Sequence, residues 1–318
     1  MDTNPPLQGA LLFFTQLELV SSTTAGGTLY GIAVPIYCLY LHASLPHLRD
    51  HDRRRQAQFM ITCSTIIMLC GLYFLVMNAW IIQDAYIKHA NFPRSPLLYE
   101  NTTFVNRSVY GVGMVCGSVV DILTAATQLW RLWVVWSGTR YVRLVVALPL
   151  LCFLGYIAMQ IRSIFLTIIA SSADLGSEFL KTRIAELALQ TATITLPTIF
   201  IAGFLVVESW HQRKLIGKPQ LSTPYMKVVV MLIESYAMES IWTILLAILL
   251  GLYHPMQQFF ADTQLYIEII AYLLVLYRVA NGRAYGSKRA HGSETQYSNI
   301  SSLQWDHTTA ASLPIGCH

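Results

Sequence analysis

Three acidic residues lie deep inside long apolar stretches of the sequence, where ionisable side chains are rare. If these stretches are helices that rise about 1.5 Å per residue, Asp121, Glu239 and Glu268 each lie about 14–16 Å from one end of their segment. The three carboxyls then share one depth, near the midplane of a hydrocarbon core about 30 Å thick. Because charge at that depth is costly and usually marks function, these residues are the first candidates for a site.

Polar residues repeat at three- or four-residue spacing beside each acid, so each set lies on one helical face. The sets are Ser235, Glu239 and Thr243; Gln264, Glu268 and Tyr272; and Asp121, Thr124 and Gln128. We expect these faces to point into a helix bundle and away from lipid. The candidate ligand or cation site is therefore Asp121, Glu239 and Glu268, with Ser235 and Tyr272 beside them.

Two interpretations of these carboxyls remain open. In the first, they are protonated and act as hydrogen-bonded contacts between helices. In the second, they bind a proton, a sodium ion or the cationic group of a ligand. We expect no Lys or Arg at the same depth, because Arg162 lies nearer the outer surface. Replacing Glu239 or Glu268 by Gln separates the two, because only the second predicts an altered response to ligand, cation or pH.

The composition requires that the elements holding these residues cross a membrane. Of 318 residues, 54% are hydrophobic and only 12% are charged. A soluble domain has about 25% charged residues, so a soluble enzyme, a disordered chain and a nucleic-acid-binding protein are excluded. Helices of about 20 apolar residues span a bilayer. The sequence predicts an all-α polytopic membrane protein, a seven-transmembrane-helix bundle with spans at about 23–41, 59–82, 110–130, 144–164, 187–207, 228–252 and 259–277.

Basic residues are concentrated on one side of the predicted spans. Fifteen of the 21 Lys and Arg residues fall in the predicted inner segments, Arg131 among them, and five fall in the outer segments. The positive-inside rule then places the N-terminus outside and the C-terminus in the cytoplasm. Asn101 and Asn106 begin two N-glycosylation tripeptides in the long loop assigned to the outside, which agrees with this orientation.

The two ends of the chain are expected to differ from the bundle of residues 23–285. Residues 1–22 form an outer N-terminal segment, which we interpret as an interfacial helix that ends at a break in Ser21–Gly27. A cleaved signal sequence is the alternative. Residues 286–318 are rich in Ser, Thr, His and Gly, which predicts a disordered cytoplasmic tail.

The sequence contains no motif of a catalytic, cofactor or metal site. It has no H-E-x-x-H, G-x-S-x-G or P-loop pattern, and its six cysteines show neither zinc spacing nor a disulfide framework. No histidine falls within a predicted span. We therefore expect no catalytic residue, no cofactor, no metal and no nucleic-acid partner, and we do not expect an enzyme.

Seven spans with an outer N-terminus and short basic inner loops are the plan of G-protein-coupled receptors. The motifs of the large rhodopsin-like class are absent. The third span ends in Trp130-Arg131-Leu132-Trp133 without an acidic-Arg-aromatic triplet, and the seventh span lacks Asn-Pro-x-x-Tyr. The similarity to these receptors is therefore one of topology.

Three motifs within residues 20–285 carry a closer resemblance. They are Leu232-Ile233-Glu234-Ser235, Trp130-Arg131-Leu132-Trp133-Val134-Val135-Trp136 and Tyr277-Arg278-Val279-Ala280-Asn281-Gly282-Arg283. The chain resembles a large family of uncharacterised seven-span integral membrane proteins of basidiomycete fungi. The resemblance indicates Glu234, Ser235, Arg278 and Gly282 as candidate functional residues. It does not indicate a ligand, because none is known for the family.

The leading functional prediction is a plasma-membrane, receptor-like protein that senses an unknown outer or membrane-borne ligand. Its expected partners are the lipid bilayer, a small-molecule ligand or cation, and a cytoplasmic signalling partner at the inner loops. The alternative is a secondary transporter or channel that uses Asp121, Glu239 and Glu268 as a proton or cation site.

Overall fold

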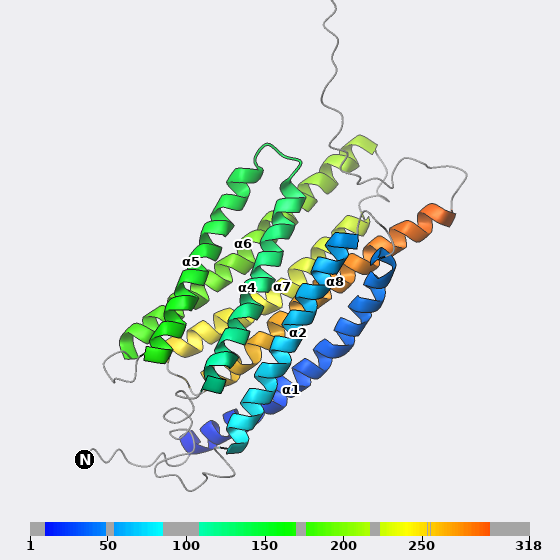
Figure 1. Ribbon diagram of the computed structural model, residues 1–318. Coiled ribbons are helices and arrows are strands. Elements are labelled where there is room, and N and C mark those ends of the chain that lie inside the picture. The colour runs from blue at the N-terminus through cyan, green and yellow to red at the C-terminus, as the bar shows by residue number, and fades with distance from the viewer. Residues whose placement is uncertain are drawn as a thin grey trace, which may run out of the picture.

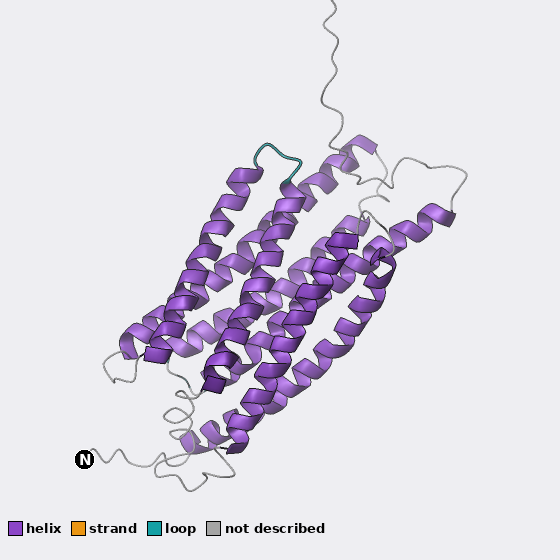
Figure 2. Ribbon diagram, in the orientation of Figure 1, coloured by secondary structure: helices purple, strands orange, loops and turns teal. Residues whose placement is uncertain are grey.

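The computed structural model describes residues 10–48, 54–84, 108–169, 176–216, 223–252, 254 and 256–292. Within these ranges the secondary structure is helical and contains no strand (Figure 2). The predicted glycosylation sites Asn101 and Asn106 lie outside the described residues.

Seven long helices form one bundle (Figure 1). They are α1 (Ala10–Ser44), α2 (Arg54–Gln83), α4 (Ser108–Trp136), α5 (Val142–Ile169), α6 (Gly176–Ile216), α7 (Thr223–Gly251) and α8 (Gln257–Gly292), and a short 3-10 helix, η1 (Leu45–Leu48), follows α1. Each long helix contains a stretch that is long and apolar enough to cross a membrane. The prediction of an all-α protein with seven candidate membrane spans is therefore confirmed for the described part of the chain.

Large apolar side chains cover the outside of the bundle. Leu69 on α2 is 61% exposed, Leu144 on α5 is 76% exposed and Val207 on α6 is 66% exposed. Contiguous apolar surface of this kind is unfavourable in water and is expected where helices meet lipid. The outer surface therefore supports a multi-pass membrane protein.

Helix α8 occupies the centre of the bundle. Of its most apolar stretch 67% is buried, whereas the other six helices bury between 17% and 33% of theirs. Helix α1 packs closely along it at Gly26, where an added Cβ would lie 2.9 Å from Cε2 of Tyr266. Glu268 therefore belongs to the helix that is best shielded from lipid.

Both ends of the bundle differ from the prediction. Helix α1 passes through Ser21–Gly27 without the expected break. Inside a membrane an interrupted helix leaves backbone groups unpaired, which favours a continuous one, and the Thr28 hydroxyl donates to the Thr24 carbonyl at 2.8 Å. Helix α8 continues past Gly286, the expected start of the tail, to Gly292.

Two helices extend beyond the predicted spans, and the added turns carry basic residues. Helix α4 continues past Arg131 to Trp136, because the apolar residues resume at Leu132. Helix α6 begins at Gly176 and therefore includes Lys181 and Arg183. Arg131, Lys181 and Arg183, which the prediction places between spans, therefore lie within helices.

Candidate functional site

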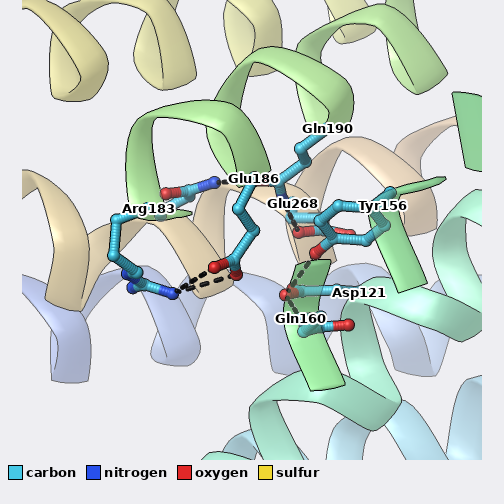
Figure 3. A network of polar contacts seen from close by, with 8 residues as sticks. Asp121, Tyr156, Gln160, Arg183, Glu186, Gln190 and Glu268 are labelled. Carbon is cyan, nitrogen blue, oxygen red and sulfur yellow. Dashed lines mark hydrogen bonds and ion pairs between the residues drawn. The ribbon is translucent and has the colours of Figure 1, made fainter. Parts of the chain in front are cut away.

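Asp121 on α4 and Glu268 on α8 form the centre of a polar network inside the bundle (Figure 3). Their carboxyl groups interact directly through a side-chain hydrogen bond. Glu268 is 3% exposed, and Asp121 is partly buried. Two carboxylates this close repel each other when both are ionised, so a shared proton or a bound cation must offset one of the charges.

Helix α5 supplies two hydrogen-bond donors to Asp121. The Tyr156 hydroxyl donates to Oδ2 of Asp121 at 2.9 Å, and Nε2 of Gln160 donates to the same oxygen at 3.0 Å. Tyr156 and Gln160 are four residues apart, so they lie on the same face of α5. Both are buried, which makes these bonds stronger than they would be in water.

Donors from α4 and α6 surround Glu268. The Thr124 hydroxyl, one turn beyond Asp121, donates to Oε1 of Glu268. Nε2 of Gln190 on α6 approaches Oε2 at 3.5 Å, and Nε2 of Gln264 donates to Oε1 of Gln190 at 2.8 Å. The network therefore ties four helices, α4, α5, α6 and α8, to one pair of acids.

Another acid near this network, Glu186 on α6, has its own counter-ion. Nη1 of Arg183 donates to Oε1 of Glu186 at 2.9 Å and to Oε2 at 3.0 Å, both within α6. The Arg183 guanidinium also attracts the Asp121 carboxylate electrostatically. Because Glu186 already balances the charge of Arg183, the Asp121–Glu268 pair keeps a net negative charge whenever it is ionised.

Glu239 on α7 completes the set of three predicted acids. It is 4% exposed and interacts electrostatically with Asp121 and Glu268. Because α7 and α8 follow each other in the chain, Glu239 and Glu268 could be expected to approach each other; the two interact electrostatically, and the direct hydrogen-bond partner of Glu268 is Asp121.

The polar faces of α4, α7 and α8 point into the bundle as predicted. Ser235 and Thr243 are buried on α7, and Thr124 and Gln128 are buried on α4. Tyr272 is 2% exposed and lies one turn beyond Glu268 on α8. The face of each helix could therefore be predicted from the spacing of its polar residues.

The family-motif residues lie apart from the acid pair. Glu234 is exposed on α7, and Arg278 is partly buried on α8, ten residues beyond Glu268. Gly282 lies on α8 as well, among residues whose side chains are not described. Of the four residues that the resemblance implicates, Ser235 alone is described as buried.

Sequence analysis missed the donors on α5 and α6. Tyr156 and Gln160 form a polar pair at i, i+4 in the largely apolar helix α5, and Arg183, Glu186 and Gln190 follow a similar spacing on α6. These spacings were a usable signal, because isolated polar residues at helical period mark an inward face. What they did not indicate was which acid each donor meets.

The arrangement is suited to a monovalent cation. Two carboxyls among neutral donors offer a place for a proton, a sodium ion or an ammonium group. In the described part of the chain, no three His, Cys, Asp or Glu side chains are grouped as ligands of a single metal ion. In comparisons with known proteins, the chain matches no family model, no curated protein and no solved structure.

Proposed function

We propose that the protein is a receptor-like seven-helix membrane protein whose ligand places a cationic group between Asp121 and Glu268. The observation that carries this proposal is the pair itself: two carboxyls in contact inside the bundle, with the nearby cation Arg183 already paired to Glu186. A cation there would replace repulsion between α4 and α8 by attraction. The resemblance to the fungal seven-span family belongs to the same proposal.

Signalling would follow from a change in helix packing. The pair joins α4 to α8, and its donors lie on α5 and α6, so an altered spacing at the pair acts on all four helices. Helices α6 and α8 carry Arg213, Lys214 and Arg278 towards the end that we predict to be cytoplasmic. A signalling partner at that end, an outer N-terminus and residence in the plasma membrane complete the proposal.

The second candidate function is a secondary transporter, and one observation favours it. Polar side chains continue beyond the pair: Nε2 of Gln128 donates to Oγ1 of Thr198 at 2.8 Å and to the Ile194 carbonyl at 3.1 Å. Arg131 follows one turn later on α4. Successive polar groups across a bundle are what a proton relay requires.

Binding is tested by the thermal stability of the purified full-length protein in detergent. Butylammonium and sodium chloride serve as cationic probes, and butanol serves as the neutral match for butylammonium. A ligand that binds only the folded state raises the unfolding temperature. We expect this rise in the natural protein and in Glu234→Gln, whose side chain is exposed, and its loss in Glu268→Gln and Asp121→Asn. Equal rises in all four proteins would refute the site.

Transport is tested separately in liposomes that contain a pH-sensitive dye. Under an imposed sodium gradient, a transporter produces a change of internal pH that disappears in Glu268→Gln. A receptor produces no such change and still shows the cation-dependent stability. The two measurements together assign the pair to sensing or to transport.

A further inference from the structure

A buried cation without an anionic partner lies near one end of α4. Arg131 is five residues before Trp136, about 8 Å from the end of the helix. Nη1 and Nη2 of its guanidinium are both buried, and neither makes a hydrogen bond of standard geometry within the described residues. The Tyr236 hydroxyl is the one group there that interacts with the guanidinium as a neutral acceptor, so the positive charge has no anionic partner among the groups shown to interact with it.

Four other helices bring hydroxyl groups to this guanidinium. Tyr40 comes from α1, Ser64 from α2, Tyr236 from α7 and Tyr272 from α8. Electrostatic interactions join Arg131 to the three tyrosines, and the Ser64 hydroxyl lies beside Tyr40 and Tyr272. The three phenol side chains are at most 5% exposed. We call these five residues the Arg131 cluster.

The cluster contains donors in excess of acceptors. The Ser64 hydroxyl already donates to the Met60 carbonyl at 2.7 Å, and the hydroxyl of Tyr272 makes no hydrogen bond of standard geometry in the described ranges, with Ser64 and Thr127 as its polar neighbours. Asp121 is ten residues from Arg131 on α4, about 15 Å along the helix. Glu239 lies one turn from Tyr236 on α7 and interacts with that tyrosine, but its own charged partner is Asp121. An unpaired buried charge is expensive, so a folded state that keeps it needs an anion there.

The free groups fit an oxyanion. Nη1 and Nη2 form the planar fork that binds two oxygens of a phosphate or carboxylate, and the Tyr272 hydroxyl can donate to another. Exposed Arg54 and Arg55 begin α2, and exposed Arg140 and Arg143 lie where α4 turns into α5, at the same end of the bundle (Figure 1). Four cations at this end raise the local concentration of anions, those of lipid headgroups included.

We propose that Arg131 and Tyr272 bind a phosphate group, carried by a lipid headgroup or free in solution, at the end of the bundle where α4 meets α5. The site is separate from the Asp121–Glu268 pair and does not depend on its role. Bound phosphate would bridge α4 and α8, with α1, α2 and α7 closing around it. It would thereby hold five helices together.

The test uses full-length protein that has been delipidated in maltoside detergent, which carries no phosphate. One arm adds sodium phosphate against sodium chloride at matched ionic strength, and the other adds phosphatidic acid against diacylglycerol. We expect a rise in unfolding temperature with phosphatidic acid. A rise in both arms identifies phosphate itself as the ligand, and a rise in the lipid arm alone identifies the headgroup. No rise in either arm overturns the proposal.

Variants decide whether the rise belongs to the Arg131 cluster. Arg131→Gln should weaken the apparent affinity for the phosphate probe by at least about tenfold, the effect of losing charge-assisted hydrogen bonds. Arg140→Gln, at the same end but exposed, should keep it. If Arg131→Gln does not fold, Tyr272→Phe provides the test, with exposed Tyr141→Phe as its control. Affinity unchanged in Tyr272→Phe or Arg131→Gln would assign the binding to another surface.

Discussion

Asp121 and Arg131 lie ten residues apart on α4, yet the bundle surrounds their charges in opposite ways. Asp121 accepts hydrogen bonds from Tyr156 and Gln160, whereas the terminal nitrogens of Arg131 make no hydrogen bond of standard geometry among the described residues. Hydroxyl and amide donors can be placed on any neighbouring helix. Anionic acceptors are scarcer, because a backbone carbonyl or a hydroxyl accepts a hydrogen bond but does not balance a positive charge. A buried acid can therefore be stabilised from within, while a buried Arg depends on an acid or on an external anion.

The largest expected effect on stability is the loss of the Tyr156 hydroxyl, measured against the loss of the Tyr272 hydroxyl in the other region. Tyr156→Phe removes a bond to a charged acceptor and should lower the free energy of unfolding by about 1.5–3 kcal/mol. Tyr272→Phe removes a hydroxyl that makes no hydrogen bond of standard geometry in the described chain, so in phosphate-free detergent its effect should stay within about 0.5 kcal/mol. Reversible unfolding in mixed micelles measures both. Equal losses would mean that the two regions are stabilised alike.

A smaller loss of unfolding free energy is expected at Gln128, which lies between Asp121 and Arg131 on α4. Gln128→Leu removes two hydrogen bonds from α4 to α6 and should cost about 1–2 kcal/mol in the same unfolding assay. Gln258→Leu is the control, because its bond to Asp262 is exposed and contributes little. Combining Gln128→Leu with Thr198→Val should cost less than the sum of the single changes. An additive result would show that the bond to Thr198 contributes nothing to stability.

A still smaller loss of stability than at Gln128 is expected at Arg183. Its side chain is 33% exposed, so water screens the ion pair and Arg183→Gln should cost less than about 1 kcal/mol. The same change removes the positive charge nearest the acid pair and should strengthen the stabilisation by butylammonium. A cation titration of the unfolding temperature measures it, with Arg162→Gln, which is exposed on α5, as the matched control. A weakened response would mean that Arg183 supports cation binding.

The inward faces could be predicted from the sequence, but the contacts between them could not. Period and composition placed Asp121, Glu239 and Glu268 inside a seven-helix bundle, because each acid repeats with polar neighbours every three or four residues. The pairing of Glu268 with Asp121 depends on how α8 is rotated against α4. Chain order indicates only that α7 and α8 are neighbours, which brings Glu239 near Glu268 but does not identify Asp121 as the hydrogen-bond partner.

Arg131 shows a different limit of prediction. In Trp130-Arg131-Leu132-Trp133 a basic residue stands among aromatic ones, which is the usual composition of a membrane interface. That pattern favours a helix that ends at Arg131, and we counted the residue with the inner loop. The helix instead continues to Trp136, and the hydroxyls around the guanidinium come from helices distant in sequence.

The central position of α8 has a consequence for biogenesis. It is the last of the described helices to leave the ribosome and the one most completely surrounded by the others. Until α8 inserts, Asp121 and Thr124 on α4 lack their partner Glu268. The incomplete bundle then has an unfilled gap between its helices, lined by these polar side chains. Chains that stop before Gln257 would leave these polar side chains exposed to lipid. Their rapid removal by membrane quality control is expected, even though six of the seven helices would be present.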